Sequence, residues 1–368
     1  MKIVVYAIAK NEAAFVDRWM DSMSEADAVV VLDTGSTDDT PARLRARGAL
    51  VEEARIVPWR FDTARNRSLA LVPEDADICV CTDLDEVFHP GWRAILEAAW
   101  KPDTARASYR YTWSFTPEGK EGVVFWIEKI HARHGWRWTH PVHEVLSWAG
   151  PGEPGPTLPI PGIQIDHHPD PHKSRAQYLP LLELSVKEGP DDDRNLHYLG
   201  REYLYCGRYD DCIRTLLRHL SLPRATWADE RAASMRFLAQ AFLHKGDTEK
   251  AVSWWLRACA EAPHLREAAV ELAQLFYTQE NWDGVLYFTG RALRITQRPH
   301  TYICEASAWG SLPHDLRTIA LSRTGRHAEA LQAAKKALAY EPQNPRLREN
   351  VRLLARMVSQ ANASDSAK

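Results

Sequence analysis

The stretch that decides the fold of this chain is Ile78 to Glu86, with the sequence ICVCTDLDE. Its first part, up to Asp83, is apolar and rich in β-branched residues, which predicts a buried strand. Its end is acidic, and alternation along an extended chain puts Asp83 and Asp85 on the same side. Two such carboxylates can hold a hard divalent cation together with phosphate oxygens. A strand that ends in a metal site is therefore predicted, and a solvated acidic turn is the alternative.

Three more strands are expected before this one. Apolar runs at residues 2–9, 28–33 and 50–57 alternate with amphipathic segments such as residues 13–23. Such alternation predicts a mostly parallel sheet that is covered by helices. Ligands bind these sheets beyond the carboxyl ends of the strands, so binding residues are expected at those ends.

The first two strands also end in polar clusters. Residues 9–12 (AKNE) follow the first strand, and residues 33–40 (DTGSTDDT) follow the second. A tight turn with a helix N-cap explains the glycine and the hydroxyl groups of the second cluster. It does not explain Asp33, whose carboxylate can accept a hydrogen bond from a nucleobase N–H. The clusters therefore predict a nucleotide site.

The chain turns helical after a Pro/Gly-rich segment at residues 151–162 and a last strand-like run. A pattern of small residues recurs through residues 193–345, with His219, Ala258, Ala292 and Ala337 at equivalent positions 39, 34 and 45 residues apart. This spacing resembles the 34-residue period of tetratricopeptide repeats. Stacked helix pairs that form a superhelix and bind a partner are expected, and an unrelated helical bundle is the alternative.

The two patterns divide the chain. With 368 residues it exceeds what one hydrophobic core usually spans. We expect a sheet domain at residues 1–172, a helical repeat domain at 173–358 and a disordered tail at 359–368, where the composition is small and polar. The six cysteines form no CxxC pair and the start does not resemble a signal peptide, which favours reduced thiols and a cytoplasmic location. No apolar run is long enough to span a membrane.

Four motifs resemble the nucleotide-sugar-binding elements of family 2 glycosyltransferases with the GT-A fold. They are AKNE, DTGSTDDT, FDTARN at residues 61–66 and DLDE at residues 83–86, within about the first 145 residues. A subset of that family carries tetratricopeptide repeats behind the catalytic domain. The resemblance implies an α/β GT-A domain followed by an all-α tetratricopeptide-repeat superhelix. It also implies a metal-dependent inverting glycosyltransferase that moves a sugar from a nucleotide diphosphate sugar, a UDP-sugar, to an acceptor hydroxyl.

The resemblance also implies roles for residues. Glu12 and Asp33 would contact the nucleoside, and Arg65 the nucleotide or its pyrophosphate. Asp83 would contact the ribose and the metal, and Asp85 the metal, which is Mn²⁺ or Mg²⁺. A surface arginine on a helix is the alternative for Arg65.

An acceptor hydroxyl needs a base. Residues 140–145 (HPVHEV) resemble the His-Glu element that these enzymes carry after the acidic motif, so Glu144 is the expected base and His143 the next candidate. A salt bridge at a strand end is the alternative for Glu144. His167, on one face of the last strand, is a candidate third metal ligand, with His172 as its alternative.

Tryptophan is unevenly distributed and points to the acceptor. Nine of the 14 tryptophans precede residue 150, and residues 106–138 interleave aromatic side chains with six basic and three acidic ones. Aromatic rings stack on sugars and on unpaired bases, while an ordinary core is the alternative. The acceptor is therefore either a glycan, lipid or peptide hydroxyl, or a hydroxymethylated base in phage DNA, which must be extruded from the duplex.

Other functions are compatible with the sequence. In a non-catalytic binding scaffold, the repeats would recruit a protein partner, and a nucleic-acid backbone is a second possible partner for them. The net charge of −3 gives no support for nonspecific polyanion binding. A nucleotidylyltransferase shares the sheet and the metal site but usually has a Gly-rich basic loop near its start, which residues 7–15 lack.

Overall fold

The structure is a computed structural model that describes residues 1–116, 119–170 and 176–366, with side chains up to residue 361. The chain forms two compact units. The sheet unit comprises Met1–Phe115 and Glu121–Pro190, and the helical unit comprises Thr116–Lys120 and Asp191–Lys368. The predicted boundary at residues 172–173 and the candidate ligand His172 lie outside the described residues.

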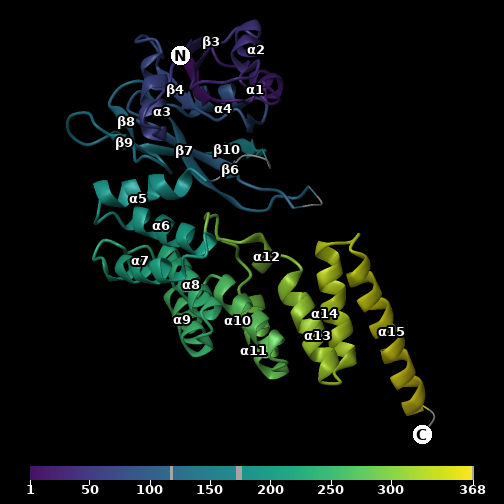
Figure 1. The fold of residues 1–368 in the computed structure, drawn as a ribbon. Coiled ribbons are helices and arrows are strands. Elements are labelled where there is room, and N and C mark those ends of the chain that lie inside the picture. The colour runs from purple at the N-terminus through teal and green to yellow at the C-terminus, as the bar shows by residue number, and fades with distance from the viewer. Residues whose placement is uncertain (117–118, 171–175, 367–368) are drawn as a thin grey trace. The chain divides into compact units, whose positions relative to one another are not determined.

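The sheet unit contains an eight-stranded mixed sheet in the order β3-β2-β1-β4-β7-β6-β10-β5 (Figure 1). The first four strands in this order run parallel, and β7 then pairs antiparallel with β4. A separate hairpin is formed by β8 and β9. The bounds are β1 (Ile3–Ala9), β2 (Ala28–Asp33), β3 (Leu50–Glu53), β4 (Ile78–Cys81), β5 (Glu86–Phe88), β6 (Arg106–Thr112), β7 (Val124–Ala132), β8 (Trp136–Thr139), β9 (Val145–Trp148) and β10 (Thr157–His167).

The central strands are buried on both faces, as their continuous apolar runs predict. Along β1, Ile3 and Val5 belong to one core cluster, whereas Val4 and Tyr6 belong to another. Helices α1, α2 and α4 contribute buried side chains to the first cluster, and α3 and the β8–β9 hairpin contribute to the second. The helices of this unit are α1 (Val16–Ser22), α2 (Thr40–Ala46), α3 (Phe61–Ala70), α4 (Trp92–Ala99) and α5 (Tyr178–Glu188).

The helical unit is a succession of antiparallel helix pairs, which confirms the expected stacked helices (Figure 1). The pairs are α6 with α7, α8 with α9, α10 with α11 and α13 with α14. The bounds are α6 (Asp193–Tyr205), α7 (Tyr209–Ser221), α8 (Ala228–His244), α9 (Thr248–Glu261), α10 (Glu267–Thr278), α11 (Trp282–Arg294), α12 (Ala306–Trp309), α13 (Leu312–Arg323), α14 (His327–Tyr340) and α15 (Pro345–Ser366).

Small residues and caps explain why these helices pair and where they begin. A Cβ added to Gly200 on α6 would lie 2.2 Å from a Leu216 methyl carbon on α7, so only glycine allows this approach. The equivalent repeat positions Ala258, Ala292 and Ala337 are all buried. Three helices begin at side-chain caps, provided by Asp192 for α6, Asp247 for α9 and Asn281 for α11.

Three features differ from the sequence-based expectations. The strands at residues 50–57 and 78–83 end earlier than expected, at Glu53 and Cys81. The compact units divide after Pro190, so α5 belongs to the sheet unit. The last helix continues to Ser366, into the segment 359–368 that composition predicts to be disordered, because residues such as Ala and Gln are compatible with a helix. None of the described helices is long and apolar enough to cross a membrane.

Candidate functional site

The loops after β1 and β2 interlock at the carboxyl ends of these neighbouring strands. The backbone N–H of Asn11 donates to Ser36 Oγ at 2.8 Å, and the N–H of Thr37 donates to Asn11 Oδ1 at 2.7 Å. The buried Glu12 lies in the same loop, and its backbone N–H donates to Thr40 Oγ1 at 2.8 Å. The two polar clusters are thus brought together, as their positions at strand ends predict.

Asp33 is buried and stabilises its own turn. Its Oδ1 accepts hydrogen bonds from the backbone N–H groups of Gly35 at 2.9 Å and Ser36 at 2.8 Å. The turn therefore accounts for this carboxylate as well as for the glycine and the hydroxyl groups. Contacts of Asp33 and Glu12 with a nucleoside stay predictions.

Arg65 projects from α3 into a buried cluster of charges, so the alternative of a surface arginine is wrong. Its side chain is 5% exposed. Nη2 donates to Asp83 Oδ1 at 2.8 Å, Nε donates to Glu144 Oε1 at 2.5 Å, and the guanidinium carbon lies 5.3 Å from the ring centre of Trp138. Arg65 thus binds two carboxylates of the chain itself, and its contact with a nucleotide stays a prediction.

Lys129 on β7 is the residue that the sequence reasoning missed. Its Nζ lies 3.1 Å from Asp83 Oδ2 and 2.8 Å from Glu86 Oε1. Burial raises the pKa of Asp83, but the positive charges of Arg65 and Lys129 lower it by more. The pKa of Asp83 therefore lies well below its usual range. Burial raises the pKa of Glu86. A lysine within a strand of mostly apolar residues was the available signal, but its partners lie more than 40 residues away in the sequence.

Asp85 and His167 meet beside this cluster. His167 Nε2 lies 3.5 Å from Asp85 Oδ2, and His167 Nδ1 lies 3.0 Å from the carbonyl oxygen of Trp113. The Trp113 and His167 rings stack with their centres 4.3 Å apart. Burial lowers the pKa of His167, but the Asp85 carboxylate raises it more, so the net pKa is raised. Two of the three predicted metal ligands are therefore neighbours.

A complete metal centre made by the protein alone is not present in the part of the chain that the structure describes. There, no three His, Cys, Asp or Glu side chains gather closely enough to hold an ion. The third predicted ligand, Asp83, binds Arg65 and Lys129 instead. Any cation at Asp85 and His167 would take its other ligands from a substrate or from water.

The two candidate bases lie on the loop before β9. Glu144 forms an ion pair with Arg65, which is the kind of contact expected if Glu144 has a structural role in a salt bridge rather than a role as the base. His143 has a φ of 51°, a strained value for a residue with a Cβ. Its ring stacks on Tyr178 with 5.7 Å between the ring centres. Neither role as a base is decided by these contacts, and both stay predictions.

The structure sorts the aromatic residues into core and surface. Trp136 and Trp138 are buried, whereas Trp113, Phe115 and Trp126 are 46%, 36% and 38% exposed. The segment between residues 106 and 138 offers less free positive charge than its composition suggests, because four of its six basic residues form ion pairs with carboxylates. These are Arg106, Arg110, Lys129 and Arg133.

Comparisons with known proteins find partial similarity to solved structures. No family model matches the chain, and no curated protein matches it. A structure of MamA has 18% identity and a TM-score of 0.37, covering 46% of this chain and 89% of MamA. Yeast Tom70 has 13% identity and a TM-score of 0.39, covering 52% and 38%. The C-terminal part of a TPR repeat-containing protein from Cytophaga hutchinsonii has 14% identity and a TM-score of 0.38, covering 45% and 60%.

These values describe a partial likeness, and the helix pairs of the chain itself define the fold of the helical unit. None of the three structures is described as a glycosyltransferase. The GT-A assignment of the sheet unit therefore stays a prediction.

Proposed function

We propose that the sheet unit is a glycosyltransferase that moves a sugar from a nucleotide diphosphate sugar to an acceptor hydroxyl. One observation carries the proposal: Asp85 and His167 lie 3.5 Å apart just beyond the end of β4, beside an Asp83 that two cations fix in place. The resemblance of four sequence motifs to family 2 enzymes supports it, and the comparisons with solved structures do not bear on it.

In the proposed reaction, the acceptor oxygen forms a bond to the anomeric carbon of the donor sugar. The bond between that carbon and the diphosphate oxygen breaks, and its electrons leave with the nucleoside diphosphate. The hydroxyl proton passes to a base on the opposite face of the sugar, which inverts the anomeric configuration. The site must therefore stabilise negative charge on one side and accept a proton on the other.

A divalent cation would stabilise the charge of the departing diphosphate. The residues present fit such an ion: Asp85 offers a carboxylate, the ligand that Mg²⁺ and Mn²⁺ prefer, and His167 offers an imidazole, which favours a transition metal such as Mn²⁺. Ions of this class are commonly held by one or two carboxylates together with substrate phosphates. A two-ligand site is thus sufficient.

Arg65 positions the groups on which the proposal depends. It binds Asp83, next to the metal pair, through Nη2 and Glu144, the proposed base, through Nε of the same guanidinium. A rigid planar fork is suited to holding two carboxylates in a fixed geometry. Glu144 would accept the proton of the acceptor, with His143 as the second candidate.

The exposed aromatic residues favour an acceptor with a sugar ring over DNA. Trp113 stacks on His167, so its exposed ring borders the proposed metal site. Phe115 stacks on the neighbouring His168 with 5.6 Å between the ring centres. Since most basic residues of this segment are already ion-paired, the segment offers little free charge for a phosphate backbone.

The test is hydrolysis of a panel of nucleotide sugars, starting with UDP-sugars, in the presence of Mn²⁺ or Mg²⁺. We expect Asp85→Ala to lower the rate by about 100-fold or more, in line with the loss of a group that stabilises the transition state. Asp75→Ala is the matched control, because Asp75 is exposed and precedes β4, whereas the site follows the other end of that strand. Full activity of Asp85→Ala would remove Asp85 from the mechanism.

A second function, recruitment of a protein partner by the helical unit, is favoured by a separate observation. This unit exposes large aromatic side chains, which commonly anchor protein interfaces. They are Tyr205, Trp227, Tyr277, Tyr287 and Tyr340. A chain that binds no nucleotide in calorimetry with Mn²⁺, yet forms a stable complex with an identified protein, would be a scaffold of this kind.

A further inference from the structure

The proposed function leaves Lys129 on β7 without a role, although this residue binds two carboxylates beyond the end of β4. Ile130 pairs with Val80 across the antiparallel β7–β4 ladder, so the preceding Lys129 lies beside the end of β4. Its Nζ lies 3.1 Å from Asp83 Oδ2 and 2.8 Å from Glu86 Oε1, and its side chain is 15% exposed. Burial lowers the pKa of Lys129, but the two carboxylates raise it by more. The ammonium group is therefore charged at neutral pH.

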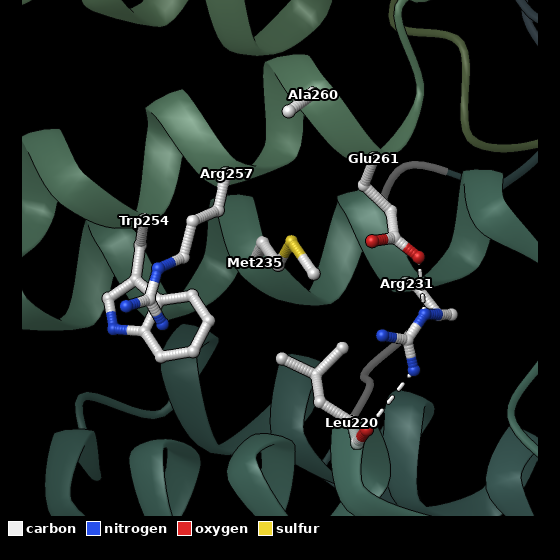
Figure 2. Close-up of a pocket in the computed structure, with 7 residues that line it drawn as sticks. All are labelled: Leu220, Arg231, Met235, Trp254, Arg257, Ala260 and Glu261. Atoms are coloured by element: carbon white, nitrogen blue, oxygen red, sulfur yellow. Dashed lines mark hydrogen bonds and ion pairs between the residues drawn. The ribbon is translucent and has the colours of Figure 1, made fainter. Parts of the chain in front are cut away.

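A cavity of the helical unit offers a contrast, because one cation pairs with one carboxylate there. The cavity measures about 460 Å³, and Arg231 and Glu261 in its lining form an ion pair (Figure 2). Nη1 of the arginine also donates to the Leu220 carbonyl at 3.1 Å. Asp83 in the sheet unit instead pairs with two cations, Arg65 and Lys129. The second cation at this carboxylate is the feature that needs an explanation.

The two cations keep Asp83 from acting as a metal ligand. Asp83 Oδ2 lies 3.1 Å from both Arg65 Nη2 and Lys129 Nζ, and Oδ1 lies 2.8 Å from the same Nη2. Two positive charges at this distance largely cancel the attraction of one carboxylate for a further cation. The protein ligands that remain for a metal ion are Asp85 and His167, which lie 3.5 Å apart.

Lys129 also occupies a second acid, Glu86. Oε1 of Glu86 accepts hydrogen bonds from Lys129 Nζ and from the Tyr111 hydroxyl at 3.0 Å, and Oε2 accepts one from the backbone N–H of Asp83 at 3.0 Å. Glu86 is 1% exposed, so little of it is open to a ligand from outside. Lys129 therefore pairs with the two acids that lie on either side of Asp85 in the sequence.

A site with only two protein ligands has a consequence for the order of binding. Mg²⁺ and similar ions are commonly held by one or two carboxylates together with phosphates of the substrate. A nucleoside diphosphate supplies the oxygen ligands that Asp83 and Glu86 do not. The affinity for the cation should therefore depend on the nucleotide, and by linkage the affinity for the nucleotide depends on the cation by the same factor.

We propose that Lys129 is a positioning residue that makes the cation of this site bind together with the nucleotide rather than before it. The ammonium group pairs with Asp83 and Glu86, which leaves Asp85 and His167 as the ligands from the protein. This inference rests on the proposed glycosyltransferase function, because it describes how the cation of that function enters the site. The alternative is a structural lysine that only neutralises buried acids, and the two roles predict opposite changes in metal affinity.

The test measures Mn²⁺ binding to the full chain by electron paramagnetic resonance of the free ion, without nucleotide and with UDP. In the unsubstituted chain, UDP should raise the affinity for Mn²⁺ about tenfold or more. Lys129→Met should raise the affinity for Mn²⁺ alone about tenfold or more, because it removes one positive charge from Asp83 and Glu86. Lys129→Arg retains the charge and should keep the low affinity. Lys2→Met is the matched control, because it removes an ion-paired lysine before the start of β1.

A second variant keeps the test decisive if Lys129→Met does not fold. Lys129→Met combined with Glu86→Gln removes the lysine together with one of its two partners, so less uncompensated charge is left inside the protein. This double variant should bind Mn²⁺ alone about threefold or more tightly than Glu86→Gln does, because only the double variant releases Asp83 from the lysine. Circular dichroism confirms that each variant is folded.

Two results would overturn the proposal. One is a Mn²⁺ affinity of the unsubstituted chain that bound UDP does not change. The other is a folded lysine variant whose affinity for Mn²⁺ alone is unchanged or lower, which is the result that a structural lysine gives. The second result leaves the proposed function in place if UDP still binds only with Mn²⁺. Failure of the function itself is recognised separately, because then no nucleoside diphosphate binds the unsubstituted chain at any Mn²⁺ concentration.

Discussion

Two arginines of this chain are buried in similar ways, and only one of them lies at a candidate site. Arg65 in the sheet unit binds Asp83 and Glu144, and Arg236 in the helical unit binds Glu271 and a second glutamate. Their side chains are 5% and 2% exposed. A buried arginine with two carboxylates is therefore not, by itself, evidence of a functional site.

The surroundings of the two pairs differ. Glu271 also accepts hydrogen bonds from Trp255 Nε1 at 2.5 Å and Gln240 Nε2 at 2.9 Å, so its pair with Arg236 joins α8, α9 and α10. The carboxylate bound by Arg65 meets a second cation, Lys129, and lies two residues from the Asp85 carboxylate that meets His167. The first arrangement holds helices together, whereas the second leaves acidic and imidazole ligands available to a cation.

The largest effect is expected from removing either arginine. Arg65→Met and Arg236→Met should each lower the free energy of unfolding by about 3–5 kcal/mol, because each removes the cation paired with a largely buried carboxylate, Glu144 in one case and Glu271 in the other. Urea titration followed by circular dichroism measures this loss. Arg352→Met, in an exposed pair on α15, serves as control and should leave the midpoint unchanged. An unchanged free energy of unfolding for Arg236→Met would mean that the ion pairs of Arg236 do not hold the helices together.

The two variants should differ in nucleotide binding. At a temperature where both remain folded, Arg65→Met should lose binding of UDP with Mn²⁺, whereas Arg236→Met should retain it. Equal binding by the two variants would erase the distinction between a site arginine and a packing arginine.

A pH effect of about 3 kcal/mol is expected from His131 in the sheet unit. Burial and the nearby Arg133 lower its pKa from 6.5 to about 4, and its Nε2 lies 2.8 Å from the Tyr6 hydroxyl. Below pH 6.5 the unfolded chain binds a proton that the folded chain does not, so stability falls as the pH drops from about 6.5 to 4. His131→Gln should reduce this slope in urea titrations at several pH values, and His134→Gln, an exposed control, should not.

The smallest expected effect concerns the exposed tryptophans. Trp113→Ala should raise the KM for a sugar acceptor about tenfold, since a stacked ring contributes about 1–2 kcal/mol. Its stability should change little because Trp113 is 46% exposed. Trp227→Ala, at a similarly exposed residue of the helical unit, is the matched control. An unchanged KM would exclude Trp113 from the acceptor site.

The sequence predicted the framework because periodicity determines it. The apolar run of β1 and the recurring small residues of the helical unit each report a local repeat, and both elements form as expected. These inferences need only local geometry, which the order of residues determines.

The charge pairs at the site were not predictable in this way. Arg65 and Asp83 are 18 residues apart, and Lys129 and Asp83 are 46 residues apart, so their contact depends on strand order. Composition also could not separate the exposed Trp113, which follows the end of β6, from the buried Trp138, which lies in the separate β8–β9 hairpin. Long-range pairing, rather than local pattern, decides these details.

The central claim, that Asp85 binds a divalent cation together with a nucleoside diphosphate, is tested most directly by isothermal titration calorimetry. UDP is titrated into the full chain and into Asp85→Asn, with Mn²⁺ present or with chelator. We predict binding that requires Mn²⁺ and is lost in Asp85→Asn. Absence of binding for UDP and other nucleoside diphosphates with Mn²⁺, or equal binding by the Asp85→Asn variant, would contradict the claim.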